Sequence, residues 1–329
     1  MSSLPRVTVV AMGGTIAGSA ASSTDPTGYR AGTTGVTELL GALPELASIA
    51  TVTGEQFAQI DSADLTDDLL LGLAKRVAVI LSDDTVDGVV ITHGTDTLEE
   101  TAYFLHLVLD SDKPVVLVGS MRPPTALSPD GPRNIFAAVT VAASAAAHGR
   151  GVLVVMNDEI HTARDVSKSS SLRVDSFESP YGPLGAVVDG EATFYRDVAR
   201  PHTASTEFDL ARITVLPRAA IVFAHSGLDA PLVESLTGYD VIVHAGFGNG
   251  TVATRIVDAL ETLRDSGALV VRATRTGSGH VTRVGASAET VNTWVAVDDQ
   301  NPQRARILAC LALTVTRDPA EIQAIFHRY

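Results

Sequence analysis

Short apolar runs alternate along this chain with segments of helical periodicity, and this alternation constrains the fold more than any other feature. The runs are flanked by glycine or polar turns and have the length of strands buried on both faces. They span Val7 to Met12, Val86 to Thr92, Val115 to Gly119 and Val152 to Met156. The helical segments between them span Asp67 to Ile80, Thr97 to Leu109 and Asn134 to His148. This order predicts an α/β fold with a wound, mostly parallel sheet, whose ligands bind at the carboxyl ends of the strands.

The pattern changes after Met156 and indicates a second domain. Asp189-Gly190, between two short apolar runs, is typical of a hairpin turn. A mixed, irregular stretch then precedes new strand and helix units that begin at Ala219. We therefore expect a larger N-terminal α/β domain over residues 1–200, a linker over 201–217, and a smaller C-terminal α/β domain over 218–329.

Charge and composition exclude several classes of function. The 329 residues include 24 basic and 38 acidic ones, for a net charge of −14, and no basic patch is found, so nucleic acid is not an expected partner. No apolar run has the length of a membrane-spanning helix, so no membrane partner is expected. The first residues lack the features of a secretory signal, which predicts a cytoplasmic protein. The single cysteine, Cys310, lies in an apolar run and is expected to be a buried hydrophobe.

Three polar turns follow predicted strands of the first domain and are expected to converge. They are Gly13-Gly14-Thr15, His93-Gly94-Thr95-Asp96 and Gly119-Ser120. Glycine there lets backbone amides approach a ligand, and the neighbouring hydroxyls can act as nucleophiles or as donors to an oxyanion. Any one such pair is also ordinary turn chemistry, but three at one sheet edge favour a site. Thr97 followed by Glu100 has the spacing of a capping box at the start of the next helix.

A threonine nucleophile needs a base, and the sequence leaves its identity open. The segment from Gly18 to Gly35 is long and polar and has the character of a lid, whose Tyr29 is either a proton relay or a packing anchor. Lys168 is either a partner of Asp96 that polarises a threonine or a solvated loop lysine. His93 is either the base that activates the nucleophile or a structural residue at the end of a strand. No phosphate-binding, dinucleotide or metal-ligand spacing is present, so neither a cofactor nor a metal is expected.

Taken together, these motifs resemble the bacterial L-asparaginase family, of the type that uses two threonines and includes asparaginase/glutaminases. The resemblance rests on Gly13 to Ala17, on His93 to Thr101 and on Asp165 to Lys168. It extends along nearly the whole chain, through Val118 to Pro123, Tyr181 to Gly185, Gly248 to Gly250 and Asn301 to Gln303. The resemblance implies an amidohydrolase that converts L-asparagine to L-aspartate and ammonia.

The resemblance also implies a role for each matching residue. Thr15 is the nucleophile of a covalent acyl-enzyme, Tyr29 assists its activation, and Thr95, Asp96 and Lys168 form a second hydrogen-bonded catalytic group. Gly14 belongs to the turn that holds the substrate, Ser62 binds its α-carboxylate, Asp96 its α-ammonium, and the carbonyl of Ser120 faces the scissile amide. Which threonine acts in which half-reaction stays open.

Departures from the family pattern bear on selectivity. Ala63 follows Ser62 where the family usually has glutamine. The family also has a glutamate that a neighbouring subunit donates; it has no match here between Gly285 and Ala288, and Glu289 is the candidate substitute. The resemblance implies a homotetramer, a dimer of dimers in which Asn249 reaches a neighbouring subunit's site. Two alternatives remain: a catalytically silent amino-acid sensor, and the amidase subunit of a tRNA-dependent amidotransferase.

Overall fold

The computed structural model describes residues 3–25, 27–284 and 290–329. The chain forms two compact units, Met1–Thr206 and Glu207–Tyr329. Each unit is an α/β layer structure with a mostly or entirely parallel sheet, as the alternation of strands and helices predicts. The boundary between the units falls within the stretch 201–217.

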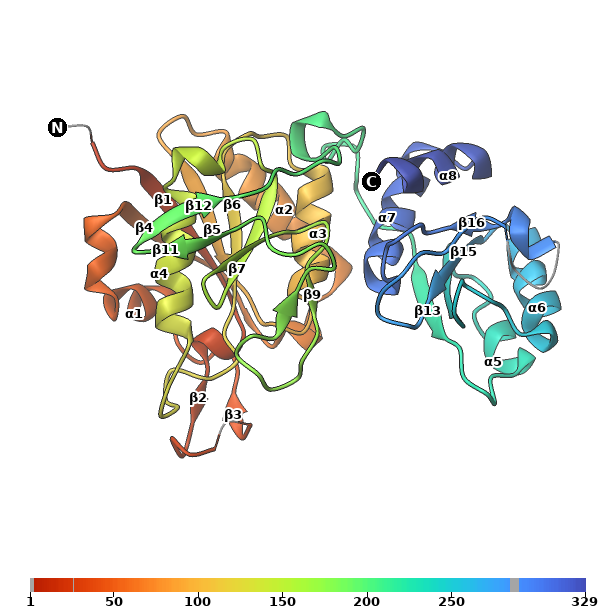
Figure 1. The fold of residues 1–329 in the computed structure, drawn as a ribbon, viewed down its shortest axis with the longest axis horizontal. Coiled ribbons are helices and arrows are strands. Elements are labelled where there is room, and N and C mark those ends of the chain that lie inside the picture. Colours follow the sequence, from red (N-terminus) through yellow and green to blue (C-terminus); the bar gives the residue numbers. More distant parts are fainter. Residues whose placement is uncertain (1–2, 26, 285–289) are drawn as a thin grey trace. The chain divides into compact units, whose positions relative to one another are not determined.

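The N-terminal unit is built on an eight-stranded sheet with the order β12-β11-β8-β7-β6-β5-β1-β4 (Figure 1). Its strands are β1 (Arg6–Gly13), β4 (Thr51–Ile60), β5 (Gly88–Thr92), β6 (Val115–Val118), β7 (Val152–Met156), β8 (Glu159–Thr162), β11 (Gly185–Val188) and β12 (Glu191–Phe194). The five strands from β4 to β7 along the sheet are parallel, whereas β8, β11 and β12 pair antiparallel. The predicted strands β1, β5, β6 and β7 are confirmed.

Helices cover both faces of this sheet, which explains why β5, β6 and β7 are buried along their whole length. The helices are α1 (Val36–Gly41), α2 (Asp67–Leu81), α3 (Leu98–Val108) and α4 (Gly131–Ala142). α1 and α4 pack together with one face of the sheet in a single apolar cluster, and α2 and α3 pack on the other face. Short 3-10 turns add Thr15–Ala17, Pro44–Ser48, Ser62–Asp64, Ala145–Ala147 and Thr203–Ser205.

Two small hairpin-like pairs lie outside the main sheet. β2 (Ser19–Ala20) pairs antiparallel with β3 (Tyr29–Arg30), and this pair projects from the body of the unit in Figure 1. β9 (Ser167–Lys168) pairs with β10 (Phe177–Glu178). The predicted turn Asp189-Gly190 joins β11 to β12, and both residues have positive φ, 51° and 79°, as this hairpin turn requires.

The chain order of the strands creates a crevice at one point of the sheet. β1 lies between β4 and β5, so the connection that leaves β1 runs to one side and the connection that leaves β5 runs to the other. At such a switch point the connections that leave the two adjacent strands run to opposite sides, which leaves room for a ligand outside the carboxyl ends of the strands. The motifs after β1 and β5 therefore stand at the position where α/β folds bind their ligands.

The C-terminal unit has a four-stranded, all-parallel sheet in the order β13-β14-β15-β16. Its elements are β13 (Ala219–Phe223), α5 (Ala230–Glu234), β14 (Val241–Gly246), α6 (Thr254–Asp265), β15 (Leu269–Thr274), a 3-10 turn (Thr290–Thr293), β16 (Val295–Ala296), α7 (Pro302–Val315) and α8 (Pro319–Arg328). α5 and α6 pack on one face, and α7 and α8 on the other. Asn301 and Asp318 cap α7 and α8 through their side chains, and each is followed by a proline at the first helical position.

One local prediction is wrong. Thr97 precedes α3, but its side chain makes no capping hydrogen bond. Its hydroxyl instead donates to the carbonyl oxygen of Ser62 at 2.9 Å and ties the start of α3 to the turn after β4. A long-range contact therefore replaces the local cap. No helix of the described residues is long and apolar enough to cross a bilayer.

Burial of His106 in α3 makes the N-terminal unit sensitive to acid. The ring is fully buried, and desolvation, with a smaller contribution from His202, lowers its pKa from about 6.5 to about 3. The unfolded chain binds a proton below pH 6.5 that the folded chain does not, so stability falls as the pH drops from 6.5 toward 3. We expect the parent protein to lose about 2 kcal/mol more than His106→Phe between pH 7 and pH 5. Urea unfolding followed by far-ultraviolet circular dichroism measures this difference, and equal losses in both proteins would contradict it.

Candidate active site

The turn after β1 approaches the turn after β5 through backbone alone. Gly13 and Gly14 have φ values of 103° and 77°, and the amide of Gly14 donates to the carbonyl oxygen of Ile60 at 2.9 Å. A Cβ atom on Gly14 would lie 2.4 Å from the Cα and N atoms of Gly94. Only glycine fits this conformation and this contact, so the predicted convergence of the two motifs is confirmed at its closest point.

Thr15 begins the short turn that follows and meets the phenol of Tyr29. Its side chain is only 6% exposed, and its Oγ1 lies 2.5 Å from the Tyr29 OH. The β2–β3 pairing places Tyr29 opposite Ala20, and the amide of Gly32 donates to the carbonyl oxygen of Gly14 at 3.0 Å. These bonds hold the segment over the threonine. The phenol thus lies where it can exchange a proton with the Thr15 hydroxyl.

Thr95 and Asp96 share the ammonium group of Lys168. Lys168 Nζ donates to Thr95 Oγ1 at 2.9 Å and to Asp96 Oδ1 at 2.5 Å. Thr95 is 5% exposed, whereas the Asp96 side chain is 60% exposed and that of Lys168 is 17% exposed. The lysine is therefore not a solvated loop residue. Its charge lies beside a hydroxyl and is paired with a carboxylate that still faces solvent.

Glu99 positions this lysine, and sequence reasoning did not single it out. Glu99 lies in the first turn of α3 and is 6% exposed. Its Oε2 accepts a hydrogen bond of 2.6 Å from the backbone amide of Lys168. A carboxylate this deeply buried needs partners, and one of them fixes the strand that carries the lysine. The signal was a second acidic residue, beside Glu100, in the first turn of a helix whose other residues are mostly apolar.

His93 is a structural residue rather than a base. Its Nδ1 donates to the carbonyl oxygen of Gly94 at 2.8 Å, so its Nε2 accepts from the Thr101 hydroxyl at 3.0 Å. Burial is the main cause that lowers the pKa of His93, and the ring is neutral. Both ring nitrogens are thus engaged in holding the turn after β5 against α3.

Ser62 and Ser120 border the same turns. Ser62 Oγ accepts from the backbone amide of Asp96 at 3.3 Å, and a Cβ atom on Gly94 would lie 2.5 Å from that oxygen. Ser120 is fully buried and donates to the carbonyl oxygen of Arg122 at 3.0 Å. Asp130 holds this second loop by accepting from the amides of residues 121 and 122, both at 2.9 Å. Every predicted site residue of the N-terminal unit therefore lies at this one edge of the sheet.

Asn249 belongs to the C-terminal unit and is engaged there. Its Nδ2 donates to Thr282 Oγ1 at 2.9 Å, and its Oδ1 accepts from the Thr282 amide at 2.7 Å. These bonds fix the amide while leaving one N–H and one lone pair for another partner. Residues 285–289, which include Glu289, lie outside the described residues. Among the residues that are described, no group of three potential His, Cys, Asp or Glu ligands could hold a metal ion.

Comparisons with known proteins give one consistent result. A family model described as "Asparaginase, N-terminal" matches residues 6–200, and one described as "Glutaminase/Asparaginase C-terminal domain" matches residues 218–326. The chain is 46% identical to a glutaminase-asparaginase of Pseudomonas fluorescens biotype A, over 99% of this chain and 91% of that protein. It is 45% identical to L-asparaginase 2 of Escherichia coli strain K12, over 99% and 94% of the two chains.

A solved structure is similar throughout. The crystal structure of a probable cytoplasmic L-asparaginase from Campylobacter jejuni has a TM-score of 0.95 and 43% identity. The match covers 99% of this chain and all of that one.

The contact between Gly14 and Gly94 gives a prediction with a matched control. Gly190 has nearly the same φ as Gly14, 79° against 77°, but nothing lies within 4 Å of a Cβ atom placed on it. Gly190→Ala is expected to cost about 1 kcal/mol of unfolding free energy for its left-handed backbone. Gly14→Ala adds a backbone clash, and the ψ of −173° at Gly14 lies in a region that is essentially restricted to glycine, so this variant is expected to cost roughly 3 kcal/mol. Urea unfolding of the two variants measures both values, and equal costs would show that the contact is not rigid.

Proposed function

The chain belongs to the asparaginase family, and we propose that it hydrolyses the side-chain amide of L-asparagine to L-aspartate and ammonia. The observation that carries the proposal is the pair of hydroxyl groups at one sheet edge, each with its own polar partner. Thr15 contacts the phenol of Tyr29, and Thr95 accepts a hydrogen bond from Lys168. Amide hydrolysis through an acyl-enzyme needs one nucleophile and at least one proton donor, and this arrangement offers both.

Thr15 is the residue that we assign as nucleophile. Its Oγ1 adds to the amide carbon of the substrate while its proton passes to the Tyr29 oxygen, 2.5 Å away, and the phenol gives its own proton to the amide nitrogen. The C–N bond then breaks, ammonia leaves with that proton, and an ester joins Thr15 to the aspartyl group. A water molecule adds to this ester, the C–O bond to Thr15 breaks, and the threonine recovers its proton.

Thr95 is better suited to donate a proton than to attack. Because its oxygen accepts from the Lys168 ammonium at 2.9 Å, electron density is drawn away from the hydroxyl and its own proton becomes a stronger donor. Asp96 balances the lysine charge. In this assignment Thr95 donates a hydrogen bond to the oxyanion, and Lys168 supplies the polarisation in both half-reactions.

The polar groups around the hydroxyls fit an amino-acid substrate. The Asp96 carboxylate is 60% exposed despite its pairing with Lys168, so it has oxygen lone pairs left for an α-ammonium group. Ser62 Oγ is assigned to the α-carboxylate, the carbonyl of Ser120 to the scissile amide, and the Gly14 turn to the substrate backbone. None of these steps requires a cofactor.

We also propose a minor glutaminase activity. It is supported by the name of the Pseudomonas fluorescens relative, which includes both activities, at 46% identity. Ala63 after Ser62 removes a side-chain amide at a position next to the α-carboxylate site. Nothing in the fold or in the comparisons favours a silent sensor or an amidotransferase subunit.

The oligomer and the location of the protein are further parts of the proposal. We assign a homotetramer built as a dimer of dimers, in which the exposed Asn249 contacts a neighbouring subunit's substrate, because its amide is fixed by Thr282 with bonding capacity to spare. We assign the protein to the cytoplasm, as the name of the Campylobacter jejuni relative states for that protein, although a Haemophilus influenzae relative is named as periplasmic.

Ammonia release from L-asparagine and from L-glutamine tests the assignment of residues. Thr15→Ala and Thr95→Ala are each expected to lower kcat with asparagine about a thousandfold or more, and Tyr29→Phe about a hundredfold. Thr85→Ala and Tyr195→Phe are the controls, because both residues are exposed and lie outside the site. If the parent protein binds aspartate but releases no ammonia, the proposed hydrolase function is wrong and the amino-acid sensor becomes the favoured function.

Mixing of inactive variants tests the shared site. Consider a dimer of one Thr15→Ala subunit and one Asn249→Ala subunit. If Asn249 serves the neighbouring subunit's site, one of the two sites keeps both residues intact. Random re-association at equal amounts is then expected to restore about a quarter of the parent activity. If Asn249 serves the site of its own chain, every site keeps one defect and the mixture stays as inactive as its parts.

A further inference from the structure

Asn249 is the only asparagine of the chain that a glycine follows. The exposed Asn249 lies in the turn after β14, which is closed by two backbone hydrogen bonds between Phe247 and Thr251, of 3.1 and 2.7 Å. Gly250 has a φ of 68°. An amide nitrogen of glycine reaches the carboxamide of a preceding asparagine more easily than that of any other residue, because glycine has no Cβ to obstruct the approach. The turn therefore holds the two reacting groups of a cyclisation next to each other.

This cyclisation is intramolecular and requires only water. The Gly250 nitrogen loses its proton to solvent and forms a bond with Cγ of Asn249. The bond between Cγ and Nδ2 breaks, and Nδ2 leaves as ammonia after it takes up a proton, so that a five-membered succinimide remains. Water then adds to one carbonyl carbon of the ring and the C–N bond of that carbonyl breaks. The product is aspartate or isoaspartate at position 249, and the chain gains one negative charge.

Thr282 restrains the carboxamide that would react. Asn249 Nδ2 donates to Thr282 Oγ1 at 2.9 Å, and Asn249 Oδ1 accepts from the Thr282 amide at 2.7 Å. Both heteroatoms of the planar carboxamide are thus held by one residue. When Gly250 attacks, Cγ becomes tetrahedral and both heteroatoms leave the positions in which Thr282 bonds them, so the two hydrogen bonds weaken before the ring closes. They therefore slow the reaction.

Thr282 is itself fixed by its neighbours. Its hydroxyl donates to the carbonyl oxygen of Val284 at 2.5 Å, and its carbonyl oxygen accepts from the fully buried guanidinium of Arg272 at 2.8 Å. Val281, the residue before it, lies against the turn, because a Cβ atom on Gly250 would be 2.6 Å from Val281 Cγ1. These contacts join residues far apart in the chain, so the restraint exists only in the folded protein.

We propose that Asn249 is a site of spontaneous deamidation and that Thr282 slows this reaction in the folded chain. The same two bonds orient the amide and determine how long it survives. The modified side chain of aspartate or isoaspartate is an acceptor only, so it lacks the N–H donors of the amide. Deamidation needs no substrate, and its rate is therefore independent of the proposed hydrolase activity.

Peptide mass spectrometry measures the modification directly. The full-length protein is kept folded at mildly alkaline pH and digested at intervals, and the peptide that contains Asn249 is followed for a gain of about 1 Da. Thr282→Val removes the hydroxyl that accepts from Nδ2 and is expected to raise the rate about fivefold or more, because one hydrogen bond is lost. Thr282→Ser keeps a hydroxyl at this position and is expected to retain the parent rate.

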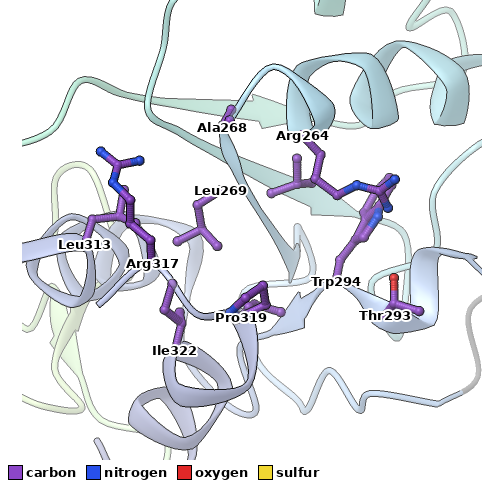
Figure 2. A pocket seen from close by; sticks show the side chains of 12 residues that line it. Arg264, Ala268, Leu269, Thr293, Trp294, Leu313, Arg317, Pro319 and Ile322 are labelled. Atoms are coloured by element: carbon purple, nitrogen blue, oxygen red, sulfur yellow. The ribbon is translucent and has the colours of Figure 1, made fainter. Parts of the chain in front are cut away.

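Thr293→Val is the matched control for the loss of a hydroxyl. Thr293 is another exposed threonine of the C-terminal unit, and its side chain appears in Figure 2. It precedes β16 at the amino end of the parallel sheet, whereas Asn249 follows β14 at the carboxyl end. This variant is expected to deamidate at Asn249 as slowly as the parent protein. Circular dichroism confirms that each variant is folded.

Two further comparisons separate sequence from fold. Asn292 precedes Thr293, whose branched Cβ hinders ring closure, so its peptide is expected to keep its mass over the same period. The parent chain unfolded in urea has lost both bonds from Thr282 and is expected to deamidate at Asn249 more than about tenfold faster than the folded protein.

Several results would overturn the proposal. They are an equal rate in Thr282→Val and in the parent protein, an equal rate in the folded and the unfolded parent, or a gain of mass at Asn292 as fast as that at Asn249. If Thr282→Val and the folded parent both stay unmodified while the unfolded chain reacts, the turn itself protects the amide and the role of Thr282 is wrong. None of these readouts depends on hydrolysis of asparagine, so a failure here is distinguishable from a failure of the hydrolase assignment.

Discussion

The backbone contact between Gly14 and Gly94 is the constraint on which the site depends. A side chain on Gly14 would overlap the Gly94 backbone, and one on Gly94 would overlap Ser62 Oγ. Because the Gly14 contact involves main-chain atoms, it fixes the turns after β1 and β5 against each other without the freedom of side-chain rotamers, and the Ser62 contact adds the turn after β4. Thr15 follows the first of these glycines and Thr95 the second, so the rigid contact sets where both hydroxyls stand. The sheet adds to this rigidity, because β1, which precedes the first turn, is hydrogen-bonded to β4 on one side and to β5 on the other.

The extent of burial decides which elements could be predicted from the sequence. β5, β6 and β7 are covered on both faces and appear as unbroken apolar runs, so the sequence locates them within two residues. β4 is an edge strand with exposed threonine and glutamine residues, and no period in its sequence identifies it. Ser62 follows this strand, and only the resemblance to a family could propose it as a site residue. Thr97 shows the other limit, because a tertiary contact to Ser62 competes successfully with the local cap.

Lys168 could be assigned only in part, for a related reason. Its sequence neighbourhood is rich in serine and is typical of a solvated loop, and the partners that bury it are about seventy residues away in the chain. Glu99 binds the backbone of Lys168, and Thr95 and Asp96 bind its side chain, so a single turn of chain after β5 organises the whole group. Local sequence patterns predict the turn and the helix that follow β5. They do not predict which distant strand places the ammonium group of Lys168 beside this turn.

The C-terminal unit holds the Asn249 amide through the central part of its sheet. Arg272 of β15 donates to the carbonyl oxygen of Thr282, and the amide of Thr282 donates to Asn249. β15 is paired with β14 on one side and with β16 on the other, so it moves only together with the sheet. A change in the position of Asn249 therefore requires either the loss of its bonds to Thr282 or a displacement of the strand as a body, which the flanking hydrogen bonds oppose. The orientation of this amide is thus set by the sheet and does not depend on the group that it meets.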